Sequence, residues 1–381
     1  MNFELTETQT LIRDTARKVA RERIAPSARE RDRNETFPRE LYAELAQLGL
    51  MGVNLPAQYG GAEAGVVSYA LAMMEVSAAC ASTAVGMAVT NMCGELIYKF
   101  GTEAQREKYL PRLTSGEAIV GAFALSEPHA GSDPGAMHTT AKRRGDTWVI
   151  NGSKQWITSG AYAGVMVVWA RTSGEGNRGL SAFIVEGGTP GLLVGKHEDK
   201  MGLRGSNTVG LTFEDCEIPA QNLLGKEGEG FKLAMIALDG GRIGIASQAC
   251  GVGRAAMEAA VQYSKERKAF GQAIAGFQAL RFMMADMKVQ LSAAELLTFR
   301  AAVLKEQGKP FSREASMAKL FASETSNRVC DKAVQVLGGY GYIDEFPVER
   351  YLRDARVQTI YEGTSEVQRI VIARETFKLL G

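Results

Sequence analysis

The first part of the chain has hydrophobic residues at helical spacing. Apolar side chains recur every three or four positions, as they do on one face of an amphipathic helix. Thr6 and Gln9 form a capping-box pair that predicts the start of a helix, and Pro26 predicts its end. A second helix is expected over residues 38–50. A third, over residues 65–100, is apolar on nearly all sides and is therefore predicted to be buried.

The middle of the chain, residues 117–222, has a period of two instead. Apolar and polar residues alternate there, which is typical of strands with one buried face. Asn151-Gly152 separates two alternating segments and predicts a β-hairpin. Further strands are expected at 165–170, 180–185 and 209–213. Together these segments predict a compact domain built on an antiparallel sheet.

After residue 228 the helical pattern returns in longer runs. Helices are expected over residues 242–266, 277–307, 312–337 and 365–379. Long helices joined by short connections indicate an antiparallel bundle. The predicted fold is thus mainly α with a β domain. It has an N-terminal helical domain (1–116), a middle β domain (117–227) and a C-terminal helical bundle (228–381).

Composition narrows the classes of protein that remain. Lys and Arg number 44 against 43 for Asp and Glu, so no overall charge favours nucleic acid or an anionic membrane. The five cysteines and three histidines lack the spacing of a disulfide framework or a metal site. No apolar run approaches the roughly 20 residues that span a bilayer. We therefore expect a soluble, cytoplasmic protein with no metal, no membrane and no nucleic-acid partner.

Glu362 is the candidate catalytic residue. It lies at a break between two helical patterns and is followed by glycine and hydroxyl residues. Gly363 would let the backbone approach a ligand, and Thr364 could cap the next helix. A carboxylate at such a break could face a cleft and remove a proton. The alternative is a solvated turn residue.

Two segments of the middle domain are candidates for binding a flat, polar ring. Residues 123–133 join an apolar strand to a loop of glycine and serine. Trp156 and Thr158 would lie on one face of a strand, because side chains alternate. The indole and the hydroxyl could together bind a cofactor, although a tryptophan in the sheet core is an alternative.

Two further segments place cations and glycines near helix ends. Arg267 closes the first long helix, where the helix dipole favours a cation and where a phosphate could also be bound. Gly338 and Gly339 would cap the third long helix and allow a ligand to approach the backbone. Residues 239–242 precede the first long helix, whose N-terminus attracts anions, so Arg242 could hold Glu362 or a phosphate.

In their order and spacing, these segments resemble the acyl-CoA dehydrogenase family over nearly the whole chain. Residues 238–248 are most similar to the short-chain (butyryl-type) and short/branched-chain members. The matching segments are 123–133, 156–158, 201–206, 267–271, 335–339 and 361–365.

The resemblance implies a β-barrel-like middle domain, a C-terminal four-helix bundle and a homotetramer, a dimer of dimers, with one FAD per subunit. The expected FAD contacts, some made across a dimer interface, are Phe123, Leu125, Ser126, Ser132, Trp156, Ile157, Thr158, Arg267, Phe270, Gln278, Gln335, Val336, Leu337, Gly338, Gly339, Thr364 and Glu366. The expected contacts with an acyl-CoA substrate are Ser132, Asp239, Arg242, Tyr361 and Gly363.

The resemblance also implies the reaction. Glu362 would remove the α-proton of a short-chain or short branched-chain acyl-CoA, and a β-hydride would pass to the flavin, giving a trans-2-enoyl-CoA. An electron-transfer flavoprotein would accept the electrons. Isovaleryl-type members carry their base at the position of Gly241, which has no carboxylate here. The uncharged residues 83–92 favour an apolar acyl chain, and Gly86 and Gly94 could widen its pocket.

Two other functions are compatible with the same fold. One is a flavin oxidase or monooxygenase, which would use oxygen. The other is a non-catalytic protein that retains flavin, as DNA-associated relatives of the family do. The near-neutral charge of the chain disfavours the second, because nucleic-acid binding tends to need a basic face.

Overall fold

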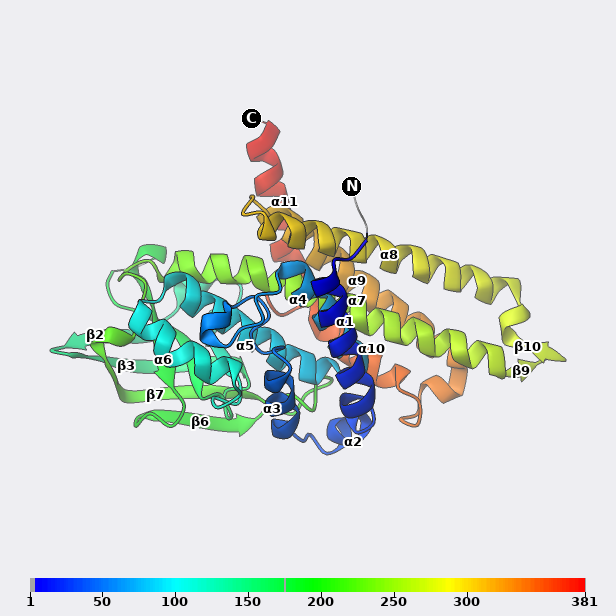
Figure 1. The fold of residues 1–381 in the computed structure, drawn as a ribbon, viewed down its shortest axis with the longest axis horizontal. Helices are drawn as coiled ribbons and strands as arrows, with labels where there is room; N and C mark the ends of the chain where they lie inside the picture. The colour runs from blue at the N-terminus through cyan, green and yellow to red at the C-terminus, as the bar shows by residue number, and fades with distance from the viewer. Residues whose placement is uncertain (1–3, 175, 381) are drawn as a thin grey trace.

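The computed structural model describes residues 4–174 and 176–380, and it divides into helices, a sheet and a second set of helices (Figure 1). The N-terminal elements are α1 (Glu7–Val19), η1 (Ala20–Ile24), α2 (Ala28–Arg33), α3 (Arg39–Gln47), η2 (Ala57–Tyr59), α4 (Val66–Ala79), α5 (Ala81–Phe100) and α6 (Glu103–Thr114).

The N-terminal helices follow the sequence pattern with two differences. Thr6 and Gln9 form the predicted capping box, in which each side chain bonds the backbone N–H of the other. The α-helix then gives way to a π-helical turn at Ala20, before Pro26. The single buried helix expected over residues 65–100 is wrong: Cys80 is extended, with φ of −161°, and separates α4 from α5.

The middle domain contains one eight-stranded sheet with the order β6-β7-β3-β2-β4-β5-β8, and β1 pairs with β4. Most neighbouring strands are antiparallel, but β1 is parallel to β4. The elements are β1 (Gly121–Ala124), η3 (Pro134–Ala136), β2 (Thr140–Arg144), β3 (Thr147–Thr158), β4 (Val165–Arg171), η4 (Asn177–Gly179), β5 (Leu180–Glu186), β6 (Leu192–His197), β7 (Thr208–Pro219), η5 (Ala220–Asn222) and β8 (Leu223–Leu224).

The hairpin predicted at Asn151-Gly152 is wrong. Strand β3 runs through this dipeptide, and its pairing with β7 shifts register there. Asn151 donates its side-chain N–H to Asp215 of β7 at 3.0 Å, so the dipeptide forms an irregularity between paired strands. The turn between β2 and β3 instead contains Gly145, whose φ is +58°.

The C-terminal domain is built on three long helices, α7, α8 and α9, with α10 and α11 beside them (Figure 1). Its elements are α7 (Gly230–Glu266), β9 (Lys268–Ala269), β10 (Gln272–Ala273), η6 (Ile274–Gly276), α8 (Gln278–Glu306), α9 (Ser312–Leu337), η7 (Gly338–Gly341), α10 (Val348–Arg356), η8 (Val357–Thr359) and α11 (Ser365–Leu380).

Helix α7 begins earlier than its hydrophobic pattern indicates. It starts at Gly230, so residues 239–242 lie inside the helix rather than before it. The hypothesis that these residues form an anion site at a helix N-terminus is therefore wrong, because their backbone N–H groups already bond within the helix.

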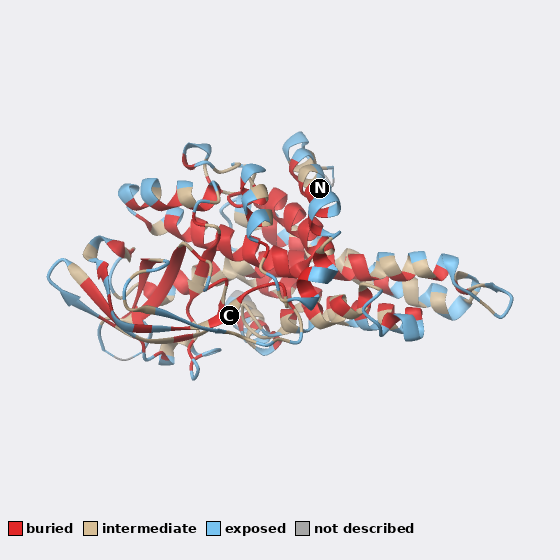
Figure 2. Ribbon diagram, turned by 90° about the horizontal axis from the view of Figure 1, so that it is seen from below, coloured by how far each residue is buried: buried red, intermediate tan, exposed pale blue. Residues whose placement is uncertain are grey.

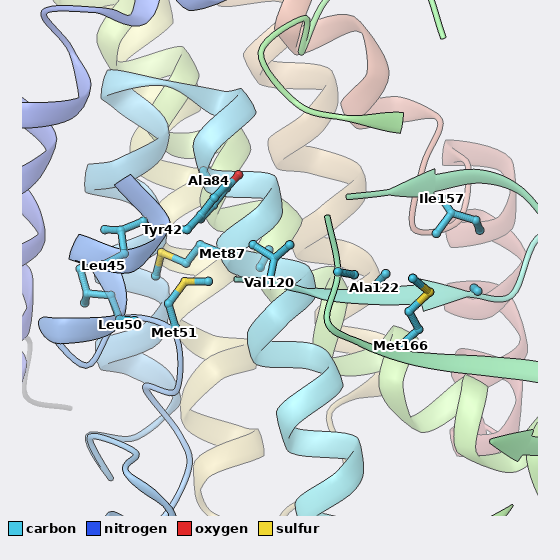
Figure 3. Close-up of a cluster of buried hydrophobic side chains, with 14 of the residues drawn as sticks. Tyr42, Leu45, Leu50, Met51, Ala84, Met87, Val120, Ala122, Ile157 and Met166 are labelled. Carbon is cyan, nitrogen blue, oxygen red and sulfur yellow. The ribbon is translucent and has the colours of Figure 1, made fainter. Parts of the chain in front are cut away.

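Buried residues join the three parts into one body. Figure 2 shows them concentrated where the helices meet each other and the sheet, whereas the end of the bundle is mostly exposed or intermediate. Figure 3 shows one cluster that runs from Tyr42 and Leu45 of α3, past Met87 of α5, to Val120 and Met166 at the sheet. The N-terminal helices and the sheet therefore share a core. Within the described residues, no helix combines the length and the apolar character needed to cross a membrane.

Candidate active site

Glu362 lies in the short connection between η8 and α11, in an unusual backbone conformation. Its φ is +54°, and that of Gly363 is +89°. A left-handed conformation is unfavourable for glutamate and persists only where neighbouring groups hold it. Here Lys319 donates to the carbonyl of Gly363 at 2.7 Å, and Gln368 donates to the same oxygen at 2.8 Å. Both side chains are buried, so the connection is fixed by hydrogen bonds from the interior of the protein.

The carboxylate of Glu362 faces the middle of helix α7. Its Oε2 atom is buried and has no hydrogen-bond partner among the described residues. A Cβ atom placed on Gly241 would lie 2.7 Å from this oxygen and 3.2 Å from the sulfur of Met92. The absence of a side chain at position 241 therefore leaves room for the carboxylate. A buried acceptor without a donor is available to a ligand.

Burial raises the pKa of Glu362 to about 7, although the nearby cations Lys319 and Arg242 act in the opposite direction. Burial also lowers the pKa of Lys319 to about 8, against the attraction of Glu362. A carboxylate with a pKa near neutrality is well matched to removing a proton at physiological pH.

Arg242 and Asp239 form a second polar group beside the carboxylate. The guanidinium of Arg242 is buried and donates to Asp239 and to Ser316, the latter at 3.3 Å. Asp239 also accepts a bond from Ser312 at 2.9 Å, and burial raises its pKa. Arg242 thus acts on Glu362 through its charge, and the structure records no hydrogen bond between them.

Tyr361, another expected substrate contact, ties the same connection to α7. Its hydroxyl donates to the side-chain oxygen of Gln248. Together with Lys319 and Gln368, this bond fixes the residues on both sides of Glu362. Sequence reasoning missed Lys319, Gln368 and Gln248, because each lies within an ordinary helical pattern and is brought to the site only by folding.

A cavity of ≈270 Å³ lies beside Gly241 and so adjoins the Glu362 carboxylate. It is lined by Tyr69, Asn91, Met92, Glu95, Leu96, Lys99, Phe100, Ile236, Ala237, Gly240, Gly241, Lys305, Gly308, Lys309 and Phe311. The segment 83–92 alone indicated an uncharged lining, but the cavity is also lined by the charged residues Glu95, Lys99, Lys305 and Lys309.

The two glycines expected to widen this cavity serve helix packing instead. A Cβ on Gly86 would lie 2.2 Å from the hydroxyl of Tyr42, and one on Gly94 would lie 2.8 Å from Leu55. Neither residue is among those that line the cavity. The two glycines allow Tyr42 of α3 and Leu55 of the connection after α3 to approach α5 closely.

On the sheet side, Trp156 projects away from the core. It has a φ of +62° and lies where the pairing of β3 with β7 shifts register, and it is 61% exposed. Ile157 is buried beneath it. The alternative of a sheet-core tryptophan is therefore excluded. The backbone N–H of Gln155 donates to the carbonyl of Ser126 at 2.9 Å, which brings the end of β1 next to Trp156.

The loop after β1 is anchored by a buried ion pair. Glu127 accepts bonds from Lys154 at 2.8 Å and from the backbone N–H groups of His138 and Thr139 at 2.6 and 3.0 Å. Lys154 also donates to the carbonyl of Leu125 at 3.2 Å. Ser132 is exposed on this loop, whereas the ring of Phe123 packs on Trp169 with centroids 4.3 Å apart. No pattern in the sequence indicated the Glu127–Lys154 ion pair.

Arg267 and the paired glycines line a hollow of ≈560 Å³ at the end of α7 and α9. Val336, Leu337, Gly338 and Gly339 border it, and the guanidinium of Arg267 lies 5.6 Å from the ring centre of Tyr340. Space is open around a Cβ built at either glycine. Of the other expected residues, Phe270 is 95% exposed and Gln278 is exposed, and neither lines the hollow.

Thr364 and Glu366 lie elsewhere, in a hollow of ≈420 Å³ near the start of α11. Arg328 and Arg356 line the same hollow. The residues expected to contact one FAD are therefore divided among three places. Figure 1 shows the sheet and the β9–β10 hairpin at opposite ends of the molecule.

Comparison with known proteins shows the family to which the chain belongs. Domain models of acyl-CoA dehydrogenase match the chain in order: the N-terminal domain at residues 6–117, the middle domain at 122–216 and the C-terminal domain at 228–377. The chain belongs to the acyl-CoA dehydrogenase family. Members of this family are FAD-dependent enzymes, so the enzyme class and the cofactor expected from the sequence are confirmed.

Individual relatives are similar over the full length. The short-chain specific acyl-CoA dehydrogenase of mouse mitochondria is 48% identical over 375 residues, which are 98% of this chain and 90% of that protein. Butyryl-CoA dehydrogenase from Megasphaera elsdenii has a TM-score of 0.97 and 45% identity, covering 99% of this chain and 100% of the other. A chain from structural work on the electron transferring flavoprotein of Acidaminococcus fermentans has a TM-score of 0.97 and 49% identity, covering 99% of each chain. The predicted fold class is confirmed.

Proposed function

We propose that this acyl-CoA dehydrogenase converts a short-chain or short branched-chain acyl-CoA into the trans-2-enoyl-CoA, with Glu362 as the base. The observation that carries the proposal is the carboxylate of Glu362. Its Oε2 atom is buried without a partner, its pKa is raised to about 7, and it lies across Gly241 from a cavity of ≈270 Å³. The short-chain relatives support the class of substrate.

The site favours transfer of a proton to Glu362. An ionised carboxylate is costly in a buried position, and protonation relieves that cost. Lys319 and Gln368 hold the backbone of Gly363, so the carboxylate needs no rearrangement before it accepts the α-proton. FAD, when bound, supplies an acceptor for the hydride that leaves the β-carbon. Asp239, Arg242, Ser132, Tyr361 and Gly363 are the proposed contacts with the acyl-CoA.

The residues proposed to hold FAD fit a flat cofactor with a diphosphate. Trp156 offers an exposed ring beside the Ser126 backbone, and Arg267 offers a cation beside the open glycine pair. Trp156 belongs to β3 of the sheet and Arg267 directly precedes the β9–β10 hairpin, and these two elements lie at opposite ends of one chain. This arrangement supports a cofactor that is shared between two copies, as in the dimer expected within the homotetramer.

Helix α8 supports further association. Phe282, Val289, Leu296 and Val303 are exposed and recur every seven residues, which places them along one stripe of the helix. An apolar stripe of this length on the surface is typical of an interface between chains. We therefore propose a homotetramer, a dimer of dimers, and sedimentation of the FAD-loaded protein would measure its mass.

An electron-transfer flavoprotein is the proposed electron acceptor, as the family resemblance implies. The similarity to a chain from the Acidaminococcus electron transferring flavoprotein work supports this partner. The alternatives are an oxidase or monooxygenase on the same fold, and a flavin-retaining protein without catalysis. The cytoplasmic location expected from the sequence stays a prediction.

Anaerobic titration of the FAD-loaded protein with butyryl-CoA tests the proposal. Loss of the visible flavin absorption, with trans-2-enoyl-CoA as the product, is the expected result. No change with any acyl-CoA would contradict dehydrogenation and favour the binding protein. Stoichiometric hydrogen peroxide in air, at a rate equal to that with electron-transfer flavoprotein, would instead identify an oxidase.

A further inference from the structure

An ion pair lies in the wall of the cavity beside Glu362. Lys305 of α8 lies with its ammonium nitrogen 2.5 Å from a carboxylate oxygen of Glu95 in α5. The other oxygen of Glu95 accepts a bond from the side chain of Asn54 at 2.7 Å. Both charged residues line the cavity, and their side chains are only 29% and 20% exposed for Glu95 and Lys305.

Two adjacent glycines of α7 relate this pair to the catalytic carboxylate. A Cβ on Gly240 would lie 3.0 Å from the Lys305 nitrogen and 3.8 Å from a Glu95 oxygen. A Cβ on Gly241 would lie 2.7 Å from Glu362. The Cα atoms of neighbouring residues are about 3.8 Å apart. The ion pair and the base are therefore separated by a short stretch of helix, which leaves room for only a few carbon atoms.

An acyl chain that reached the pair would meet two opposite charges, which are fixed by hydrogen bonds among Glu95, Lys305 and Asn54. Glu95 is bonded to both Lys305 and Asn54, so neither oxygen is free to turn away. Attraction to Lys305 lowers the pKa of Glu95 against the effect of burial, so the carboxylate stays ionised. Separating a partly buried ion pair to admit methylene groups is unfavourable, because each charge would lose its partner.

We propose that the Glu95–Lys305 ion pair is the end wall of the acyl pocket and excludes acyl chains longer than short ones. This inference rests on the proposed function, because it assigns the cavity to the acyl group. A polar wall of this kind limits the length of the acyl chain that fits, and its position depends on two side chains from different helices. The remaining interpretation of the pair, that it only ties α8 to α5, gives a different result in the test below.

The test replaces both partners at once, so that no buried charge is left alone. Glu95→Ala/Lys305→Ala opens the end of the cavity, and Glu95→Gln/Lys305→Gln removes the charges while keeping most of the volume. The matched control is Glu306→Ala, since Glu306 ties α8 to the backbone N–H of Val67 at 3.1 Å and does not line the cavity. For each FAD-loaded protein, kcat/KM is measured with butyryl-, hexanoyl- and octanoyl-CoA.

The alanine pair should raise the ratio of kcat/KM for octanoyl-CoA to that for butyryl-CoA by at least about tenfold, because further methylene groups become buried. The glutamine pair should raise it less, and Glu306→Ala should not change it. Calorimetric titration of the same changes in a Glu362→Gln background should show the same shift in the ratio of dissociation constants, without turnover.

An unchanged ratio in both double variants, while butyryl-CoA still reduces the flavin, would overturn this inference alone. The ion pair would then serve only to link α8 to α5. A shift of the same size in Glu306→Ala would also overturn it, because general loosening of α8 would then be the cause. Failure of the wild-type flavin to be reduced by any short-chain or short branched-chain acyl-CoA would overturn the proposed function, and this inference with it.

Discussion

The carboxylates of Glu362 and Glu127 both lie near a buried lysine, yet their environments shift the pKa in opposite directions. Glu127 accepts bonds from Lys154 and from two backbone N–H groups, and these hold its pKa below the usual value although burial opposes them. Glu362 has Lys319 close by, but that ammonium bonds the carbonyl of Gly363 instead of the carboxylate. Its pKa is therefore raised to about 7.

The two sites differ in which oxygen atoms accept the hydrogen bonds. Burial disfavours a charged carboxylate in both places, and hydrogen bonds to the carboxylate decide whether the ionised form is recovered. At Glu127 the donors make a rigid support for the loop after β1. At Glu362 the donors fix the backbone and leave Oε2 free, so the carboxylate is positioned without being satisfied. The proposed base and the structural anchor thus differ in which atoms accept the nearby hydrogen bonds.

Removing the carboxylate of Glu362 should have the largest effect. Glu362→Gln keeps the size of the side chain but cannot accept the α-proton, so flavin reduction by butyryl-CoA should slow by about 10⁴-fold, the upper range for a general base. Stopped-flow absorbance under anaerobic conditions measures the rate. Glu258→Gln, whose side chain in α7 is 62% exposed, is the control. A rate in Glu362→Gln close to that of the control would rule out Glu362 as the base.

Removing the lysine partner of Glu127 should have the next largest effect, on stability. Lys154→Met leaves a buried carboxylate without its cation, which should lower the free energy of unfolding by about 3–5 kcal/mol. Glu127→Gln/Lys154→Met should recover much of that loss, because no charge is then stranded. Urea unfolding of all variants measures both values. Equal losses in the single and double variants would show that the charge is not the cause.

The raised pKa of Glu362 predicts that its carboxylate destabilises the folded protein at high pH. The folded pKa of about 7 exceeds the ordinary value of 4.5, so the favourable contribution is complete below 4.5 and is lost as pH rises through 7. Relative to wild type, Glu362→Gln should therefore gain about 2–3 kcal/mol of unfolding free energy between pH 5 and pH 8. A gain in the opposite direction would mean that the carboxylate is stabilised as an anion.

The smallest effect is expected at Lys319, whose charge lowers the pKa of Glu362. In wild type, the rate of flavin reduction should rise with pH and level off above about 7, since the base must be ionised. Lys319→Met should move this profile upward by about one pH unit. Lys319→Arg keeps the charge and should move it much less. Profiles from single-turnover reduction distinguish the two, and identical profiles for wild type and Lys319→Met would exclude an electrostatic role.

The sequence predicted local features better than features made by folding. Thr6 and Gln9 form their capping box because both partners lie in one helical turn. Asn151-Gly152 carries a strong turn signal, but pairing with β7 keeps the strand extended. Residues 239–242 look like a helix start because two glycines interrupt the pattern, yet packing continues α7 through them.

The candidate site divides in the same way. Glu362 could be found because glycine and hydroxyl residues follow it directly. Lys319, Glu95 and Lys305 could not be found in this way. Each is a single polar residue in a helix, and its partner lies many positions away in the sequence. Trp156 was ambiguous for a related reason: alternation gives the face of a strand but not which face is covered.

The close approach of Gly241 to Glu362 bears on how such a protein can change over time. Two separate stretches of chain reach the same point, and only one of them has room for a side chain there. A carboxylate could therefore be relocated from the start of α11 to the middle of α7, provided that the vacated residue became small. The carboxylate would then occupy the same place in the site although it came from a different position in the sequence.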